Sequence, residues 1–339
     1  MTDPTGTAPG SMFFAVSSSG ALAYLPGVAS FGNSRDSNLA IFPRDGPPEP
    51  LPLRLGNYRS PRVSTDGRWV AFEIGDEKQW HVAVYEIGAR RTVRRLTFEG
   101  NSRAPLWSPD GVWVLFASDR EGDVAIYRTR ADGSGAPERL TKPDKDVSHT
   151  PQSWTRDGTQ LLFSAGPPPG IQQSRLFLLS MKERTVTAFG DMAARDARFS
   201  PDGRWVAYGT RAAGAVSGNR NQVFVEPFPR TGAKYLLPRP SGHPLWSPEG
   251  DALLTNATAG VSELTPVVYT PAFDFGESVQ VPKRGRNEGD PMVSRTQADM
   301  MPDGRVIGVL RQSSAESTTT DIHVVLNWFN ELHQRIPIR

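Results

Sequence analysis

The sequence contains no cysteine, which excludes disulfide bonds, thiolate metal sites and a cysteine nucleophile. It also lacks any run of the roughly 18 apolar residues that a membrane-spanning helix needs. Its first residues show neither the basic nor the apolar region of a signal peptide. We therefore expect no membrane span in this chain. The compartment stays open: extracytoplasmic if the chain is part of a larger signalling protein, and otherwise cytoplasmic.

Charge of one sign is also lacking. Lys and Arg number 38 and Asp and Glu number 36, and no basic block occurs, so nucleic acid is not an expected partner. The motifs of serine hydrolases, zinc peptidases and P-loop nucleotide-binding proteins are absent. We expect a non-catalytic protein without a cofactor, with a propeller lyase or hydrolase as the alternative.

Glycine (32) and proline (30) are abundant and spread along the chain, as is typical of an all-β protein with many turns. A four-residue turn motif of the Ser-Pro-Asp-Gly type recurs, in which Pro and Gly suit the backbone angles of a tight turn. Its glycines are Gly20, Gly67, Gly111, Gly158, Gly203, Gly250 and Gly304. Their near-equal spacing, close to 45 residues, is typical of the blades of a β-propeller.

Each turn lies between two short apolar runs, and a further apolar segment and a more polar one follow, which together predict four strands per repeat. We therefore predict an all-β fold: a single propeller of seven four-stranded blades, with six blades plus a terminal cap as the alternative. The predicted propeller covers residues 12–328. A disordered tail (1–11) precedes it, and a short helical tail (329–339) follows it.

The repeated SPDG strings and the segment SDREGDVAIYR (118–128) resemble the TolB-like class of WD-related propellers. The strings FFAVSSSGALAYLPG (13–27), TFEGNSRAPLWSPDG (97–111) and VVLNWFNELHQRIP (324–337) resemble the C-terminal propeller region of bacterial eukaryotic-type serine/threonine kinases. This resemblance implies a sensory or protein-interaction propeller, and the kinase motifs themselves are absent. Seven turn motifs depart from the six blades of TolB, so the partners of TolB are not carried over.

Polar residues recur where each innermost strand begins, a position that lines one mouth of the channel in a propeller. The candidate ligand-binding residues are Arg59, Arg103, His149, Arg195, Asp196, His243, Gln297 and Asp299. Three interpretations remain open: an ordinary hydrated mouth, a site for a polar ligand or ion, and catalysis with a histidine as general base.

Two loops between second and third strands, 166–170 and 211–220, are expected to protrude on one face, where a protein partner could contact them. The expected partners are therefore a protein or a small polar ligand. We expect the chain to be monomeric and to hold no metal ion.

Overall fold

The computed structural model describes residues 14–16, 22–24, 37–76, 79–89, 93–167, 174–211, 221–258, 261–282, 297–311 and 323–325. These residues form strands and turns, with no helix among them, so the prediction of an all-β protein is confirmed. The chain divides into two units, residues 36–310 and the two chain ends 1–35 and 311–339. The predicted tails 1–11 and 329–339 lie outside the described residues.

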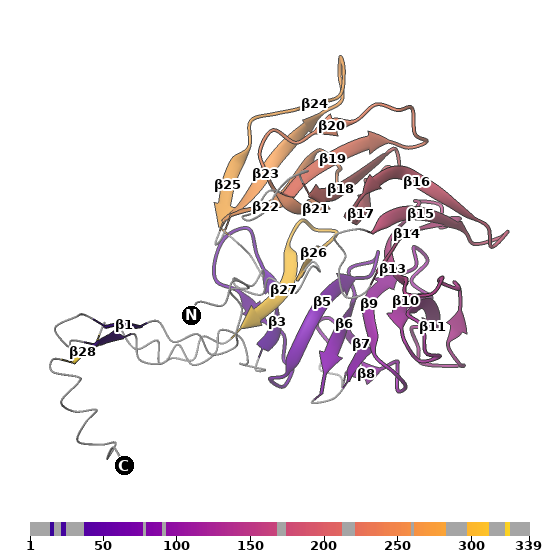
Figure 1. Cartoon of the computed structure of the whole chain (residues 1–339), viewed down its shortest axis with the longest axis horizontal. Coiled ribbons are helices and arrows are strands. Elements are labelled where there is room, and N and C mark those ends of the chain that lie inside the picture. The colour runs from indigo at the N-terminus through magenta and orange to yellow at the C-terminus, as the bar shows by residue number, and fades with distance from the viewer. Residues whose placement is uncertain are drawn as a thin grey trace, which may run out of the picture. The chain divides into compact units, whose positions relative to one another are not determined.

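The larger unit contains six antiparallel sheets, which are the blades of a propeller (Figure 1). Blade 1 consists of β5 (Asn57–Val63), β6 (Trp69–Gly75), β7 (Trp80–Glu86) and β8 (Arg94–Arg95). Blade 2 consists of β9 (Ser102–Trp107), β10 (Trp113–Ser118), β11 (Ala125–Arg130) and β12 (Glu138–Arg139). Blade 3 consists of β13 (Ser148–Trp154), β14 (Gln160–Gly166), β15 (Arg175–Ser180) and β16 (Val186–Ala193).

The remaining blades follow the same plan. Blade 4 consists of β17 (Arg195–Phe199), β18 (Trp205–Arg211), β19 (Asn221–Pro227) and β20 (Tyr235–Leu236). Blade 5 consists of β21 (Gly242–Trp246), β22 (Ala252–Thr258), β23 (Val261–Val268), β24 (Asp274–Phe275) and β25 (Val279–Pro282). Blade 6 consists of β26 (Ala298–Met300), β27 (Val306–Arg311), β3 (Ser37–Phe42) and β4 (Glu49–Pro50).

The first strand of each blade is the innermost one. Each of these strands contacts the innermost strand of the next blade, and β26 contacts β5, so the ring is closed. The prediction of a single propeller is therefore confirmed.

The predicted number of seven blades is wrong, because the ring contains six. The strands β1 (Phe14–Val16) and β2 (Leu22–Tyr24), which flank the first turn motif, pair with β28 (His323–Val325) in a separate sheet. The strand β3 follows β2 in the chain but pairs with β27 in blade 6. The sequence contains strands for a seventh repeat, and pairing between distant parts of the chain removes them from the ring.

The core lies in the seams between blades. Each of six buried apolar clusters combines residues of two neighbouring blades. In the seam between blades 1 and 2, for example, Val82 and Val84 pack with Val114 and Phe116. The second and third strands are buried on both faces, which explains why their sequences are continuously apolar.

Blade 5 breaks this pattern at one position. Five residues after the turn glycine, blades 1–4 carry a buried aromatic side chain: Phe72, Phe116, Phe163 and Tyr208. Blade 5 carries Thr255 there, opposite Glu263 on the neighbouring strand, and both are buried. Glu263 Oε1 lies 3.1 Å from Arg239 Nη1, whereas Glu263 Oε2 and Thr255 Oγ1 are buried without a hydrogen-bond partner. Such unpaired polar atoms lower the stability of a core.

We predict that the double substitution Thr255→Phe, Glu263→Ala stabilises the protein. It reproduces the pair Phe72 and Ala83 of blade 1 and removes a buried carboxylate, so the free energy of unfolding should rise by about 1–3 kcal/mol. Urea denaturation measures this difference. The single variant Thr255→Val is the control for the hydroxyl alone. A lower urea midpoint for the double variant would show that the polar atoms are satisfied, for instance by buried water.

The turn motif is closed by its own side chains. In blade 1, Trp69 N donates to Ser64 Oγ (2.9 Å) and Arg68 N to Asp66 Oδ1 (3.0 Å). The backbone of the final glycine is left-handed, with φ of 70° at Gly111 and 74° at Gly203. Only glycine adopts this conformation without strain.

We predict that Gly111→Ala lowers the free energy of unfolding by about 1–2 kcal/mol, because an added Cβ penalises left-handed backbone. No atom lies within 4 Å of that Cβ, so the loss reports backbone strain alone. Gly111→Asn, which tolerates this conformation better, is the matched control and should lose less. Chemical denaturation of the two variants tests the prediction, and equal losses would contradict it.

Candidate functional site

The innermost strands carry a bulge at a repeated position. In blades 1–5 the pairing between first and second strand shifts at this point. The residue seven before the turn glycine has a positive φ in four blades: Ser60 (49°), Ala104 (53°), Asp196 (52°) and His243 (54°). A bulge interrupts the alternation of side chains along a strand and re-aims them. Strained non-glycine residues of this kind often cluster at functional sites.

Three charged side chains lie five residues before the turn glycine: Arg62, Arg198 and Asp299, from blades 1, 4 and 6. Arg198 Nη1 lies 3.1 Å from Asp299 Oδ1, and Asp299 Oδ2 accepts a hydrogen bond from Val63 N (2.9 Å). Burial and the nearby positive charge of Arg198 lower the pKa of Arg62 to about 10, although Asp299 and Asp196 act in the opposite direction. Two partly buried guanidinium groups therefore repel each other inside the ring.

A second group joins blades 4 and 5. Asp196 Oδ2 lies 3.0 Å from His243 Nδ1 and 3.7 Å from Arg195 Nε. Arg195 Nη2 also donates to Asn221 Oδ1 (2.9 Å). Burial raises the pKa of Asp196, but the attraction of His243, then of Arg195 and Arg62, outweighs burial and holds the pKa below its usual value. Asp196 is thus a carboxylate within ion-pair distance of both His243 and Arg195.

Arg59 and Arg103 meet at Trp80. The Arg59 guanidinium lies 4.2 Å from the centre of the Trp80 ring, and that of Arg103 lies 6.0 Å away. Arg59 stands directly opposite Glu73 in the sheet, and Glu73 Oε1 accepts a hydrogen bond from the bulge residue Ala104 (2.7 Å). Cation–π contacts of this kind fix both arginines in place.

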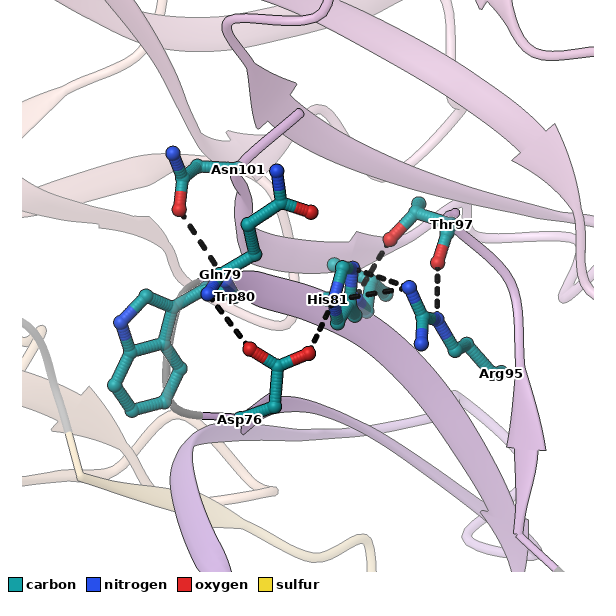
Figure 2. Close-up of polar contacts among 8 residues, drawn as sticks. Asp76, Gln79, Trp80, His81, Arg95, Thr97 and Asn101 are labelled. Atoms are coloured by element: carbon teal, nitrogen blue, oxygen red, sulfur yellow. Dashed lines mark hydrogen bonds and ion pairs between the residues drawn. The ribbon is translucent and has the colours of Figure 1, made fainter. Parts of the chain in front are cut away.

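Figure 2 shows the polar contacts that hold Trp80 at the start of β7. Trp80 N donates to Asn101 Oδ1 (3.2 Å), in the connection to blade 2. The neighbouring residue His81 is buried, with Nε2 at 3.3 Å from Asp76 Oδ2 and its ring nitrogens at 2.9 Å from Arg95 Nη2. Burial and then the charge of Arg95 lower the pKa of His81. A neutral His81 accepts from Arg95 and donates to Asp76, so this cluster is a structural support for the arginine site.

His149 does not join these groups. Its ring lies 5.0 Å from that of Phe163 in its own blade, and its backbone N–H donates to Val124 O (2.9 Å) of blade 2. Burial lowers the pKa of His149 to about 4. Its position is nine residues before the turn glycine, whereas His243 is seven residues before, which explains why the two histidines face different surroundings.

We predict that His149→Phe reduces the loss of stability in mild acid. Between pH 6.5 and about 4 the unfolded chain protonates this imidazole while the folded protein does not, so folding becomes less favourable as the pH falls through this range. Phenylalanine keeps the ring contact with Phe163 and has no proton to gain. Melting temperatures at pH 7 and pH 4.5 test this. An equal decrease in wild type and variant would contradict the low pKa of His149.

The structure thus brings five of the predicted residues together in two groups, which are Arg59 with Arg103, and Arg195 with Asp196 and His243. A sixth predicted residue, Asp299, pairs with Arg198. Gln297 occupies the bulge position of blade 6, and its Oε1 is buried without a hydrogen-bond partner. Four further residues of these groups were not among the predicted ones: Trp80, Arg62, Arg198 and Asn221. Aligning the repeats on their turn glycines would have revealed Arg62 and Arg198 as charges at a position that is apolar in blades 2 and 5.

A pocket of about 420 Å³ opens beside the turn motifs. Arg198 and Asp299 are the charged residues that line it, and turn residues such as Ser64, Pro201 and Pro302 form its rim. Phe199, Leu245, Trp246, Met300 and Met301 provide apolar walls. Most of the two loops predicted to contact a partner, 166–170 and 211–220, lies outside the described residues.

Among the described residues, no group of three or more histidine, aspartate or glutamate side chains is placed to hold a metal ion. In the same part of the chain, no helix has the length and apolar character to cross a membrane.

Known proteins that resemble this chain identify its family. The family model for the TolB β-propeller domain matches residues 48–274. None of the curated proteins matches the sequence. Among solved structures, a protein assigned as TolB from Agrobacterium tumefaciens is 16% identical, with a TM-score of 0.58, and the match covers 83% of this chain and 99% of that one.

Two further structures show the same fold. TolB from Acinetobacter baumannii is 18% identical, with a TM-score of 0.54, over 74% of this chain and 68% of that one. An oligogalacturonate lyase in complex with manganese is 15% identical, with a TM-score of 0.53, over 95% of this chain and 83% of that one. At these identities the likeness concerns the propeller fold.

Proposed function

Because the chain belongs to the TolB β-propeller domain family, we propose that it is a non-catalytic binding module whose ring receives a negatively charged group of a ligand or protein partner. As the resemblance to bacterial kinase propellers implies, such a module would serve as the sensor or interaction part of a signalling protein.

One observation carries this proposal: the inner strands and their neighbours bring five partly buried arginines together with three carboxylates, and two of the arginines repel each other. Arg62 and Arg198 lie close enough that the charge of Arg198 lowers the pKa of Arg62. The arginines described above are Arg59, Arg62, Arg103, Arg195 and Arg198, and the carboxylates near them are Glu73, Asp196 and Asp299. An anion entering the ring would relieve the repulsion between the guanidinium groups, and it would do so where the local dielectric is low.

A thermal-shift experiment with small anions tests the proposal. Citrate, galacturonate, glutamate and phosphate are compared with neutral galactose at low salt. We expect at least one anion to raise the melting temperature, because a ligand that binds only the folded state stabilises it. Arg62→Gln should abolish most of this shift. Arg204→Gln is the matched control, since Arg204 pairs with Asp202 in an exposed turn. If no anion stabilises the wild type, the proposal is wrong.

An enzyme remains the second candidate, and the pair of Asp196 and His243 favours it. A carboxylate 3.0 Å from an imidazole nitrogen is the arrangement that prepares a histidine to act as a general base. One structural relative is named as a lyase of oligogalacturonate, which is an anion. If an anion that binds is also converted, His243→Ala should abolish conversion while binding survives.

A further inference from the structure

We infer that the ligand enters from the side of the turn motifs and carries a carboxylate next to an apolar group, with Arg198 as the residue that binds the carboxylate. This inference rests on the proposed function and specifies its ligand, its direction of approach and the residue that recognises it.

Arg198 is held in place with one side of its guanidinium unused. Its Nη1 is paired with Asp299 at 3.1 Å, while its Nη2 is buried and has no hydrogen-bond partner. The side chain is 15% exposed, so bulk water has little access to it. A guanidinium offers donors in a fixed planar fork that suits carboxylates. The Nη2 atom is therefore an unsatisfied donor, and a ligand oxygen would reach it when the guanidinium shifts toward the pocket that Arg198 lines.

The surroundings of Arg198 are rigid. Asp299, which orients the guanidinium, also accepts a hydrogen bond from Val63 N in blade 1. The indole of Trp246 in blade 5 donates to the backbone oxygen of Arg198 (3.1 Å). Groups from blades 1, 4, 5 and 6 thus hold Asp299 and the backbone of Arg198 in place before any ligand arrives, which reduces the entropy lost on binding.

The pocket beside Arg198 defines the rest of the ligand. Its volume of about 420 Å³ lies at the small end of the range for ligand sites. Phe199, Leu245, Trp246 and Met300 line it, and Arg198 and Asp299 are the charged residues among its lining. Apolar walls beside a single charged donor group suit an apolar acid. Both a free acid and the last residue of a peptide have this chemistry.

The experiment uses isothermal titration calorimetry with N-acetyl-phenylalanine, its amide and acetate. We expect the acid to bind and the amide and acetate to bind at least tenfold more weakly, because the first loses the charge-assisted hydrogen bond and the second the apolar contact. A tripeptide that ends in phenylalanine, with a free or an amidated C-terminus, separates the two sources of the ligand. Tighter binding of the free-ended tripeptide than of the small acid indicates a peptide, and the reverse order indicates a free acid.

Variants test the role of Arg198. Arg198→Gln should weaken binding of the acid about tenfold or more, while the amide binds wild type and variant equally. Because this variant leaves Asp299 without its ion pair, the double variant Arg198→Gln, Asp299→Asn provides a neutral pair and should show the same loss. Arg204→Gln is again the control. Circular dichroism confirms that each variant is folded.

The outcomes separate this inference from the proposed function. If anions stabilise the wild type and Arg62→Gln removes that effect, but the acid and its amide bind equally or Arg198→Gln binds the acid normally, the inference is wrong and the proposed function stands. If no anion binds at all, both are wrong.

Discussion

The bulge in the innermost strands is the constraint on which the site depends. A regular strand would turn every second side chain back into the seam between blades. The shift at Ser60, Ala104, Asp196 and His243 changes that alternation at the same level of several blades. It also leaves backbone N–H groups that side chains of neighbouring strands satisfy, as Glu73 does for Ala104 and Gln152 for Ala197. One backbone irregularity thus both positions the polar groups and ties the blades to one another.

For the charges inside the ring, the cost of desolvation opposes the attraction between paired groups. A buried ion pair rarely contributes much net stability, because desolvation offsets most of the attraction. The pair of Arg198 and Asp299 instead contributes to the geometry of the site, because Asp299 also accepts a hydrogen bond from the backbone of Val63. The three charged positions five residues before the turn glycine come from non-adjacent repeats of the sequence. Their apolar counterparts in other blades, Leu106 and Leu245, belong to the core.

Much of the fold follows from local signals. The turn motif and the apolar runs around it predicted the blade strands and the propeller architecture, because each hairpin depends on residues that are close in the sequence. The number of blades was not predictable in this way. The turn after β1 has the spacing of the other turns, but whether β3 pairs with β2 or with β27 depends on contacts between distant parts of the chain.

The residues of the candidate site also divide into those that the sequence predicted and those that it did not. The arginines at the start of β5 and β9 were found because their position repeats. Arg62 and Arg198 were missed because the repeats were not aligned on their turn glycines, an alignment that sets both against the leucines of blades 2 and 5. His149 looked equivalent to His243 for the same reason. A difference of two positions relative to the turn glycine places its ring against Phe163 instead.

Blade 6 is assembled from both halves of the chain, and this affects the order in which the molecule acquires its structure. During synthesis β3 emerges long before β27. Its apolar residues Leu39 and Ala40 therefore lack the neighbouring strand β27 while the five intervening blades form. Throughout that interval the edge of β3 offers free backbone groups to any strand that matches it. The β27 of a second nascent chain matches it equally well. Blade 6 is therefore the place where two chains would exchange strands if they folded side by side.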